Sequence, residues 1–352
     1  MGKTKHYVNI VRRKIMHGLT QNIGIPFQIK KGFHLNNGKN EVRVLIVRPN
    51  SRLGNQLMIT PLLQEIETVF PNAKIDLFVR GNLAPILFKN YKSIDRIIKL
   101  PPKPFKELGK YIQTWYHLRK YTYDIVFNVD AASSSGRLCT KWVRGNVKFF
   151  GDNKPQGLYS DESHMAKWPV YNFQALLHEI NYSFSPEPPH PLSLHLNEDE
   201  IKHGKQLLKS LVGNDKPTIM FYTFATGSKC LSKEWWKPFF SELKEKYGDT
   251  YNLLEVLPKE NVSQIDFESL NYYSTDIREM GSVMHHGSVF ITGDCGVMHL
   301  ASSVDVPVIA LFSAENIECY KPYNPGSKAF LVNKISNAQV FKALGDSISQ
   351  VD

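Results

Sequence analysis

The stretch from Ser288 to Phe312 constrains the fold of this chain more than any other. Two short apolar runs rich in β-branched residues, at 289–292 and 308–312, predict buried strands. Between them lie a tight loop at 293–296 and a helical segment from 297 to about 304, which Pro307 ends. This pattern predicts a β–α–β crossover. The loop therefore follows the carboxyl end of a strand and begins a helix, where free N–H groups favour an anion such as a pyrophosphate.

The residues of this loop suit a ligand site. Gly293 and Gly296 let the backbone approach a ligand closely, and Asp294 can cap the helix or accept hydrogen bonds from hydroxyls. The plainer alternative is that Asp294 is only a helix cap and His299 only a packed helix residue.

The longer string around the loop resembles the signature of glycosyltransferase family 9, which contains the lipopolysaccharide heptosyltransferases. The matching residues are Asp294, Gly296, Met298, His299, Leu300 and Ala301, followed by Pro307, Val308, Ala310, Leu311 and Phe312. The resemblance implies an α/β protein of GT-B fold, with two Rossmann-like domains whose parallel sheets face a central cleft. It also implies a donor site that includes Asp294, Cys295, Gly296, Val297 and His299. Family members usually carry Ser or Thr at the position of Cys295, and a thiol is a weaker hydrogen-bond donor.

A second loop belongs to the same expected donor site. Thr226, Gly227 and Ser228 supply N–H and hydroxyl donors after the predicted strand 218–222. Lys233 matches the lysine of the family's Lys-x-Trp element, which implies a contact with the donor phosphates; a lysine point charge suits a diphosphate. The resemblance also implies that Glu260, beyond the next strand, faces a ribose hydroxyl.

The N-terminal half resembles the family in two segments, RLGNQLMITPLLQEIETVFPNAKIDLFV and YDIVFNVD. The first implies acceptor contacts from Arg52, Gly54 and Asn55. Family members usually have Asp at the position of Asn55, where it is the presumed catalytic base. Asn55 can orient an acceptor hydroxyl but cannot deprotonate it.

Another acid must therefore act as the base if the chain is catalytic. Asp130 is our prediction, because it follows the predicted strand 124–129 at the carboxyl edge of the sheet, where ligand-facing residues lie in open α/β sheets. The alternative is that Asp130 only caps the helix that follows. Asp161 and His164 are the reserve candidates.

Regular β–α alternation and one proline-rich stretch define the expected domains. Residues 185–194 contain four prolines, which neither a helix nor a central strand can cross. We expect a basic N-terminal extension at 1–40, an acceptor-binding domain at 41–187 and a nucleotide-sugar domain at 188–352. The last segment predicts a terminal helix that packs across both domains.

Charge is concentrated at the N-terminus. Residues 1–40 hold eight Lys and Arg and no Asp or Glu, which leaves a net charge of +2 for the other 312 residues. The body is nearly neutral and carries no nucleic-acid-binding motif, so no nucleic-acid partner is expected. Val8, Val11, Ile15 and Leu19 have helical spacing, so residues 1–20 form either a basic helix on an anionic membrane surface or a solvated or packed extension.

The expected location is cytoplasmic, or peripheral on the inner face of the bacterial inner membrane. No apolar run approaches the roughly 20 residues of a membrane-spanning helix. Four scattered cysteines argue against a disulfide framework or a zinc site.

The resemblance to family 9 implies an inverting, metal-independent glycosyltransferase that moves heptose from ADP-heptose onto a lipopolysaccharide core or another lipid-linked, cell-surface glycan. The nucleotide sugar is a co-substrate, and no cofactor is expected, because lysine and helix dipoles can neutralise the leaving diphosphate. Two alternatives remain open. Asn55 suggests a nucleotide-sugar-binding protein without catalysis. The segment RLGNQL resembles fucosyltransferases that use GDP-fucose, although their Arg-Arg-Gly-Asp element is missing.

Overall fold

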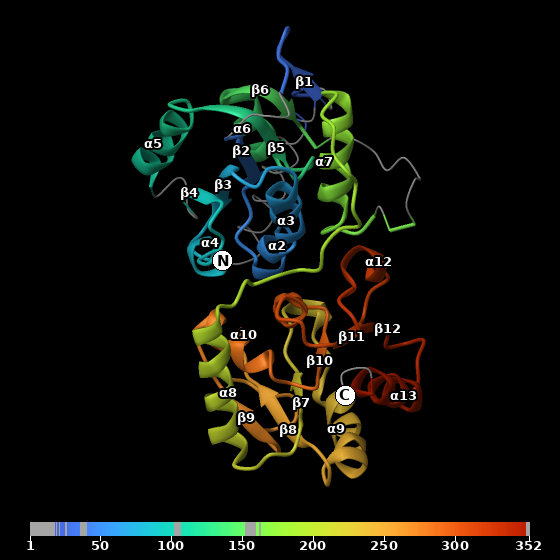
Figure 1. Ribbon diagram of the computed structural model, residues 1–352. Coiled ribbons are helices and arrows are strands. Elements are labelled where there is room, and N and C mark those ends of the chain that lie inside the picture. Colours follow the sequence, from blue (N-terminus) through green and yellow to red (C-terminus); the bar gives the residue numbers. More distant parts are fainter. Residues whose placement is uncertain are drawn as a thin grey trace.

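The computed structural model describes residues 18, 20, 22–24, 27–35, 41–101, 107–151, 160, 161 and 163–349. Two α/β domains lie one above the other in Figure 1, and each contains a six-stranded sheet. The expectation of two domains built on parallel sheets is therefore confirmed. The predicted membrane-binding helix of residues 1–20 lies outside the described residues except for residues 18 and 20.

The first sheet has the strand order β1-β6-β5-β2-β3-β4. Its parallel strands are β2 (Arg43–Arg48), β3 (Lys74–Arg80), β4 (Ile94–Leu100), β5 (Thr122–Asn128) and β6 (Arg144–Phe149). A short strand, β1 (Phe27–Ile29), joins β6 in antiparallel orientation. β1 lies in the segment that was expected to be only an extension, and three residues are too few to show a strand pattern in the sequence.

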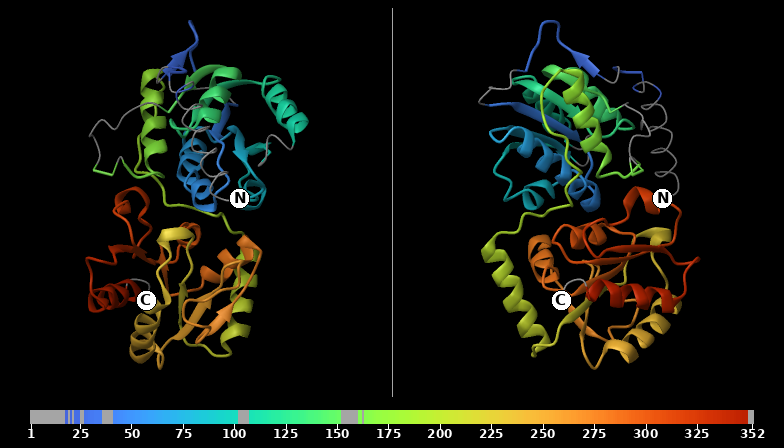
Figure 2. Two further views of the ribbon diagram at one scale, coloured as in Figure 1. Left: turned by 180° about the vertical axis from the view of Figure 1, so that it is seen from behind. Right: turned by 45° about the vertical axis from the view of Figure 1, so that its right-hand side comes forward.

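Helices cover both faces of the first sheet (Figure 2). They are α2 (Leu53–Leu57), α3 (Thr60–Val69), α4 (Ala84–Leu87), α5 (Leu108–Leu118), α6 (Ser134–Trp142) and α7 (Trp168–Glu179). Alternate β2 residues belong to two hydrophobic clusters, with Val44 and Ile46 in one and Leu45 and Val47 in the other. This alternation is what a strand buried on both faces requires. Pro61 lies where one helix ends and the next begins: α2 ends before it, and it occupies the first turn of α3, whose N-cap is Ile59.

The second sheet is entirely parallel and has the order β12-β11-β10-β7-β8-β9. Its strands are β7 (Thr218–Tyr222), β8 (Asn252–Val256), β9 (Leu270–Tyr272), β10 (Val289–Gly293), β11 (Val308–Phe312) and β12 (Lys328–Leu331). Its helices are α8 (Glu198–Val212), α9 (Lys233–Tyr247), α10 (Ile277–Met284), α11 (Gly296–Ser302), α12 (Ile317–Tyr320) and α13 (Asn337–Ile348). The predicted crossover at 288–312 is therefore β10–α11–β11.

The terminal helix does not cross between the domains. The apolar face of α13, including Val340 and Leu344, packs with Ile309 and Leu311 of the second sheet in one hydrophobic cluster. Figure 1 shows α13 beside β12, within the C-terminal domain. The predicted crossing helix is therefore wrong, because the second sheet itself has an apolar face that α13 covers.

Arg278 of α10 connects the two domains. Its side chain is buried and forms two hydrogen bonds to Glu200, from Nε to Oε1 at 2.6 Å and from Nη2 to Oε2 at 2.7 Å. The guanidinium also donates to backbone carbonyls of the first domain and of the connection between α7 and α8, namely those of Ile86, Leu87, Leu194 and His195. One side chain thus holds both domains and the connecting segment.

Glu200 should make stability depend on acid pH. Hydrogen bonds from Arg278 are the largest cause that lowers its pKa to about 2, from an ordinary value of 4.5. Because the folded-state pKa is the lower one, Glu200 contributes stability above pH 4.5 that is lost as the pH falls toward 2. We expect the free energy of unfolding, measured with urea at several pH values, to fall across this window. The slope should be shallower in Glu200→Gln, and an unchanged slope would contradict this assignment.

Within the described ranges, no helix combines the length and apolar content needed to cross a membrane.

Candidate active site

The N-terminal turns of α2 and α11 meet where the two domains face each other. A Cβ atom on Gly54 would lie 2.5 Å from Cδ2 of His299, and one on Gly296 would lie 3.3 Å from Cβ of Leu53. The lack of a side chain at both glycines allows this approach. The contact brings the predicted acceptor loop, with Gly54 and Asn55, next to the predicted donor loop.

Asp294 is buried but does not cap α11. The N-cap residue is Cys295, which makes no side-chain capping hydrogen bond. The carboxylate of Asp294 instead forms an ion pair with Lys229 and accepts a hydrogen bond from Nδ2 of Asn316 at 3.4 Å. The interpretation of Asp294 as a simple helix cap is therefore wrong. A buried acid held by a lysine beside a helix N-terminus is a polar cluster at the domain contact.

Lys229 is the residue of this cluster that the sequence analysis missed. It ends the short 3-10 helix Gly227–Lys229, and its ammonium also lies 5.7 Å from the ring centroid of Tyr320. Lys233, the predicted phosphate ligand, is the first residue of α9 and pairs with Asp266, which Lys237 also contacts. The two lysines hold the pKa of Asp266 at about 2. The sequence could have indicated Lys229 through its position, because it directly follows Thr226, Gly227 and Ser228, the predicted hydrogen-bond donors of this loop.

The predicted donor residues differ in exposure. Thr226, Gly227 and Ser228 are exposed in the loop after β7, and Glu260 is exposed beyond β8. His299 is buried, and burial lowers its pKa to about 4, so its imidazole is neutral near pH 7. Burial likewise raises the pKa of the half-buried Cys295, so this thiol is also neutral. Lys229 and Asp294 therefore carry the charges of this cluster, while His299 and Cys295 add none.

On the first domain, Asp130 follows β5 as predicted. Its Oδ2 accepts a hydrogen bond from Nη1 of Arg48 at 2.8 Å, and its Oδ1 accepts one from the N–H of Ala132 at 3.1 Å. Asp130 does not cap α6; Ser133 does. The Arg48 side chain is 4% exposed and that of Asp130 is 29% exposed, so the carboxylate compensates a buried charge and still reaches solvent. Asn55 is half-buried on α2, and Arg52 is its exposed N-cap residue.

The reserve candidates for a base are engaged in local structure. Asp161 bonds Lys167 Nζ at 2.5 Å and the hydroxyl of Tyr171 at 2.8 Å, and its pKa is lowered, although burial alone would raise it. The Nε2 of His164 lies 2.9 Å from the Lys321 carbonyl, and its Nδ1 accepts from the N–H of Ala166. Both ring nitrogens of His164 are thus occupied, and burial lowers its pKa to about 4.

Within the part of the chain that the structure describes, no group of three His, Cys, Asp or Glu side chains could hold a metal ion.

Two facing Rossmann-like domains with a polar cluster at their contact define the GT-B fold, and comparisons with known proteins identify the family. The model of glycosyltransferase family 9 (heptosyltransferase) matches residues 112–345, more than half of the chain. The chain therefore belongs to glycosyltransferase family 9 and is a glycosyltransferase.

Individual relatives agree with this assignment. Lipopolysaccharide heptosyltransferase 3 of Escherichia coli (strain K12) is 21% identical over 292 residues, which cover 77% of this chain and 82% of the relative. The crystal structure of a family 9 glycosyl transferase from Veillonella parvula has a TM-score of 0.67 at 16% identity, covering 90% of this chain and all of the other. The E. coli heptosyltransferase WaaC with ADP has a TM-score of 0.64 at 16% identity, covering 87% of this chain and 100% of WaaC. These structures have the same fold as this chain.

The two lysines can be distinguished by nucleotide binding. A charge-assisted contact typically contributes about 1.5–3 kcal/mol, or roughly 10- to 100-fold in affinity. We expect a loss of this size for ADP in Lys229→Ala, measured by calorimetric titration, because its ammonium already lies beside α11. Lys233→Ala should show a smaller loss, because Lys233 begins α9 and pairs with Asp266, between β8 and β9, rather than with a residue at the start of α11. A loss in Lys233→Ala alone would instead locate the diphosphate at α9, as the sequence motif predicts.

Proposed function

We propose that this protein transfers heptose, with inversion, from ADP-heptose to a lipopolysaccharide core or another lipid-linked glycan, and that it needs neither a metal nor a cofactor. The observation that carries the proposal is the α2–α11 contact, which brings Gly54 of the predicted acceptor loop against His299 of the predicted donor loop. Membership of family 9 supports the class of reaction. A solved relative is described with ADP-2-deoxy-2-fluoro heptose, which supports the choice of donor.

The proposed reaction uses charges that this chain provides. A base on the first domain removes the proton of an acceptor hydroxyl, whose oxygen then attacks the anomeric carbon of the donor sugar. The bond from that carbon to the diphosphate breaks, and ADP leaves with the electron pair. Lys229 lies beside the start of α11, where a cation and helix N–H groups together can stabilise the charge that develops on the leaving diphosphate.

Donor choice is tested by binding and then by turnover. The full chain is screened by thermal shift with ADP, GDP, UDP and CMP sugars, and each binder is assayed for hydrolysis and for transfer to purified lipopolysaccharide cores. We expect ADP-heptose to give the largest shift and transfer without added metal, also in the presence of EDTA. Preference for GDP-fucose would favour the fucosyltransferase alternative, and dependence on a metal would contradict the metal-free mechanism.

Asn55 supports a second candidate, a nucleotide-sugar-binding protein without catalysis. Asn55→Asp would restore the carboxylate that family members usually have at this position, where it is the presumed catalytic base. We expect Asn55→Asp to change the transfer rate less than threefold if Asp130 is the base, as measured under single-turnover conditions. A wild-type protein that binds donor without turnover, combined with activity that appears only in Asn55→Asp, would establish the non-catalytic function instead. Asn55→Gln serves as the matched control, because it cannot accept a proton.

A lipid-linked acceptor also implies contact with a membrane. The sequence predicts this contact for residues 1–20, whose basic character suits an anionic surface. Deleting these residues should lower binding to anionic vesicles while leaving activity on a soluble acceptor unchanged. Equal vesicle binding by the full and the shortened chain would contradict that role.

A further inference from the structure

Helix α5 exposes an apolar stripe. Leu108, Ile112 and Tyr116 are four residues apart and therefore share one face of the helix. Their exposed fractions are 57%, 60% and 69%. Trp142, at the end of α6, extends the stripe: it is 46% exposed, and its Nε1 donates to the Trp115 carbonyl at 3.0 Å. Contiguous exposed apolar side chains of this size indicate an interaction surface.

The stripe is not an unfinished part of the core. The opposite side of α5 already packs on the first sheet, with Leu118 fully buried and the Trp115 ring edge-on to Phe78 at 5.8 Å. Figure 1 shows α5 at the outer margin of the N-terminal domain, beside the edge strand β4. A partner can therefore reach it without entering the α2–α11 contact.

Basic residues surround this stripe. Five basic residues are exposed here: Lys110 on α5, Arg119 and Lys120 directly after α5, Lys141 in the last turn of α6, and Arg144 at the start of β6. The Arg119 guanidinium lies 4.6 Å from the Trp142 ring centroid, so it borders the stripe directly. Glu107 is an acid beside this set, and it pairs with Lys110 at 3.2 Å. The surface is therefore strongly positive.

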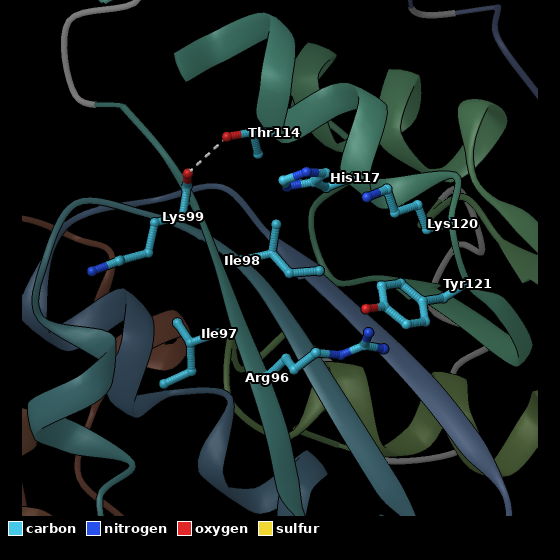
Figure 3. Close-up of a pocket in the computed structure, with 8 residues that line it drawn as sticks. All are labelled: Arg96, Ile97, Ile98, Lys99, Thr114, His117, Lys120 and Tyr121. Carbon is cyan, nitrogen blue, oxygen red and sulfur yellow. Dashed lines mark hydrogen bonds between the residues drawn. The ribbon is translucent and has the colours of Figure 1, made fainter.

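The other flank of α5 borders an open cavity of about 440 Å³ beside β4. Figure 3 shows its lining, which combines cationic, apolar, aromatic and polar side chains: Arg96, Ile97, Ile98, Lys99, Thr114, His117, Lys120 and Tyr121. Asp76 neutralises Arg96. Among the described residues, no acid lies within ion-pair distance of Lys99 or Lys120. These two ammonium groups can therefore meet phosphate groups of a partner.

We propose that the α5 surface, defined as Leu108, Ile112, Tyr116 and Trp142 with the flanking basic residues, docks onto an anionic phospholipid bilayer. The apolar stripe enters the boundary of the acyl chains, and the lysines and Arg119 contact lipid phosphates. Tyr and Trp suit this depth, because one end of each side chain is apolar and the other is polar. A second copy of the chain fits less well, because a symmetric contact would bring the same positive charges together.

This proposal concerns a surface other than residues 1–20 and does not depend on the donor or the acceptor. The full chain is sedimented with vesicles of phosphatidylglycerol and phosphatidylethanolamine, or of phosphatidylcholine alone. We expect binding to the anionic vesicles only, weakened by salt, because charges are screened within about 10 Å at 0.1 M salt. In Ile112→Ser/Tyr116→Ser the affinity should fall at least tenfold at an unchanged melting temperature. Lys99→Glu/Lys120→Glu should also weaken binding.

The matched control is Leu270→Ser/Tyr273→Ser, which removes one aliphatic and one aromatic side chain, 44% and 46% exposed, from the other domain. It should bind as the wild type does. Because residues 1–20 also carry positive charge, hydrogen exchange locates the contact: vesicles should slow exchange at the amides of 108–120. Wild-type binding by the α5 variant, or no protection of α5, would overturn the proposal. The proposal would also be overturned if the wild type were a dimer and Ile112→Ser/Tyr116→Ser a monomer, since the surface would then join two copies of the chain.

Discussion

Asp130→Asn is expected to lower the rate of sugar transfer by about 10²- to 10⁴-fold while the affinity for the nucleotide sugar is retained, which is the usual effect of losing a general base. Asp130 follows β5 at the carboxyl edge of the first sheet, and its carboxylate is oriented by Arg48 and by the N–H of Ala132. The measurement is the single-turnover rate at saturating donor, with donor affinity determined separately by calorimetry.

Asp130 also compensates a buried cation, so a structural effect must be separated from a catalytic one. Nε of Arg48 is buried without a hydrogen-bond partner among the described residues, which makes the charge of Asp130 important there. Removing one member of a buried pair typically costs 3–5 kcal/mol. Arg48→Met combined with Asp130→Asn should therefore recover the melting temperature but not the rate.

A near-wild-type rate in Asp130→Asn would show that Asp130 is not the base. Asp161 and His164 are poor candidates to act as the base in its place. The carboxylate of Asp161 already bonds to Lys167 and Tyr171, and the ring nitrogens of His164 already bond to two backbone groups. That result would call for the same rate measurement on Asp161→Asn and His164→Gln, whereas a wild-type protein without measurable transfer would favour the non-catalytic alternative.

Arg278→Ala is expected to reduce the free energy of unfolding by about 3–5 kcal/mol, the usual cost of breaking a buried ion pair. The substitution removes the ion pair with Glu200 and the hydrogen bonds to four backbone carbonyls at the junction of the domains. Urea denaturation followed by circular dichroism measures the change. Arg278→Lys should restore only part of it, because an ammonium cannot reproduce the planar fork of the guanidinium.

The matched control for Arg278 is Arg43→Ala. Arg43 pairs with Asp95 at 3.2 Å at the surface, with a side chain that is 34% exposed. Exposed pairs of this kind contribute about 0–1 kcal/mol. Equal losses in the two variants would mean that the Arg278 network does not determine the stability of the domain junction.

The local sequence determined where strands, helices and glycine loops lie. β7 and β11 have the predicted bounds, since continuous apolar patterns depend only on neighbours along the chain. The local sequence also placed the loop at 293–296 at the carboxyl edge of the second sheet and the end of β5 at the carboxyl edge of the first. Short edge strands such as β1 were not predictable, because their pairing is supplied by another strand.

Only the tertiary structure decided which of these groups meet. No pattern in the chain indicates that Lys229 pairs with Asp294, 65 residues away, or that Arg278 reaches Glu200 and the carbonyls of α4. Such contacts depend on how whole domains pack. The sequence likewise shows an apolar stripe on the terminal helix but not its partner, which proved to be the second sheet. Hydrophobic burial specifies that an apolar face is covered, and the shape of the assembled fold selects what covers it.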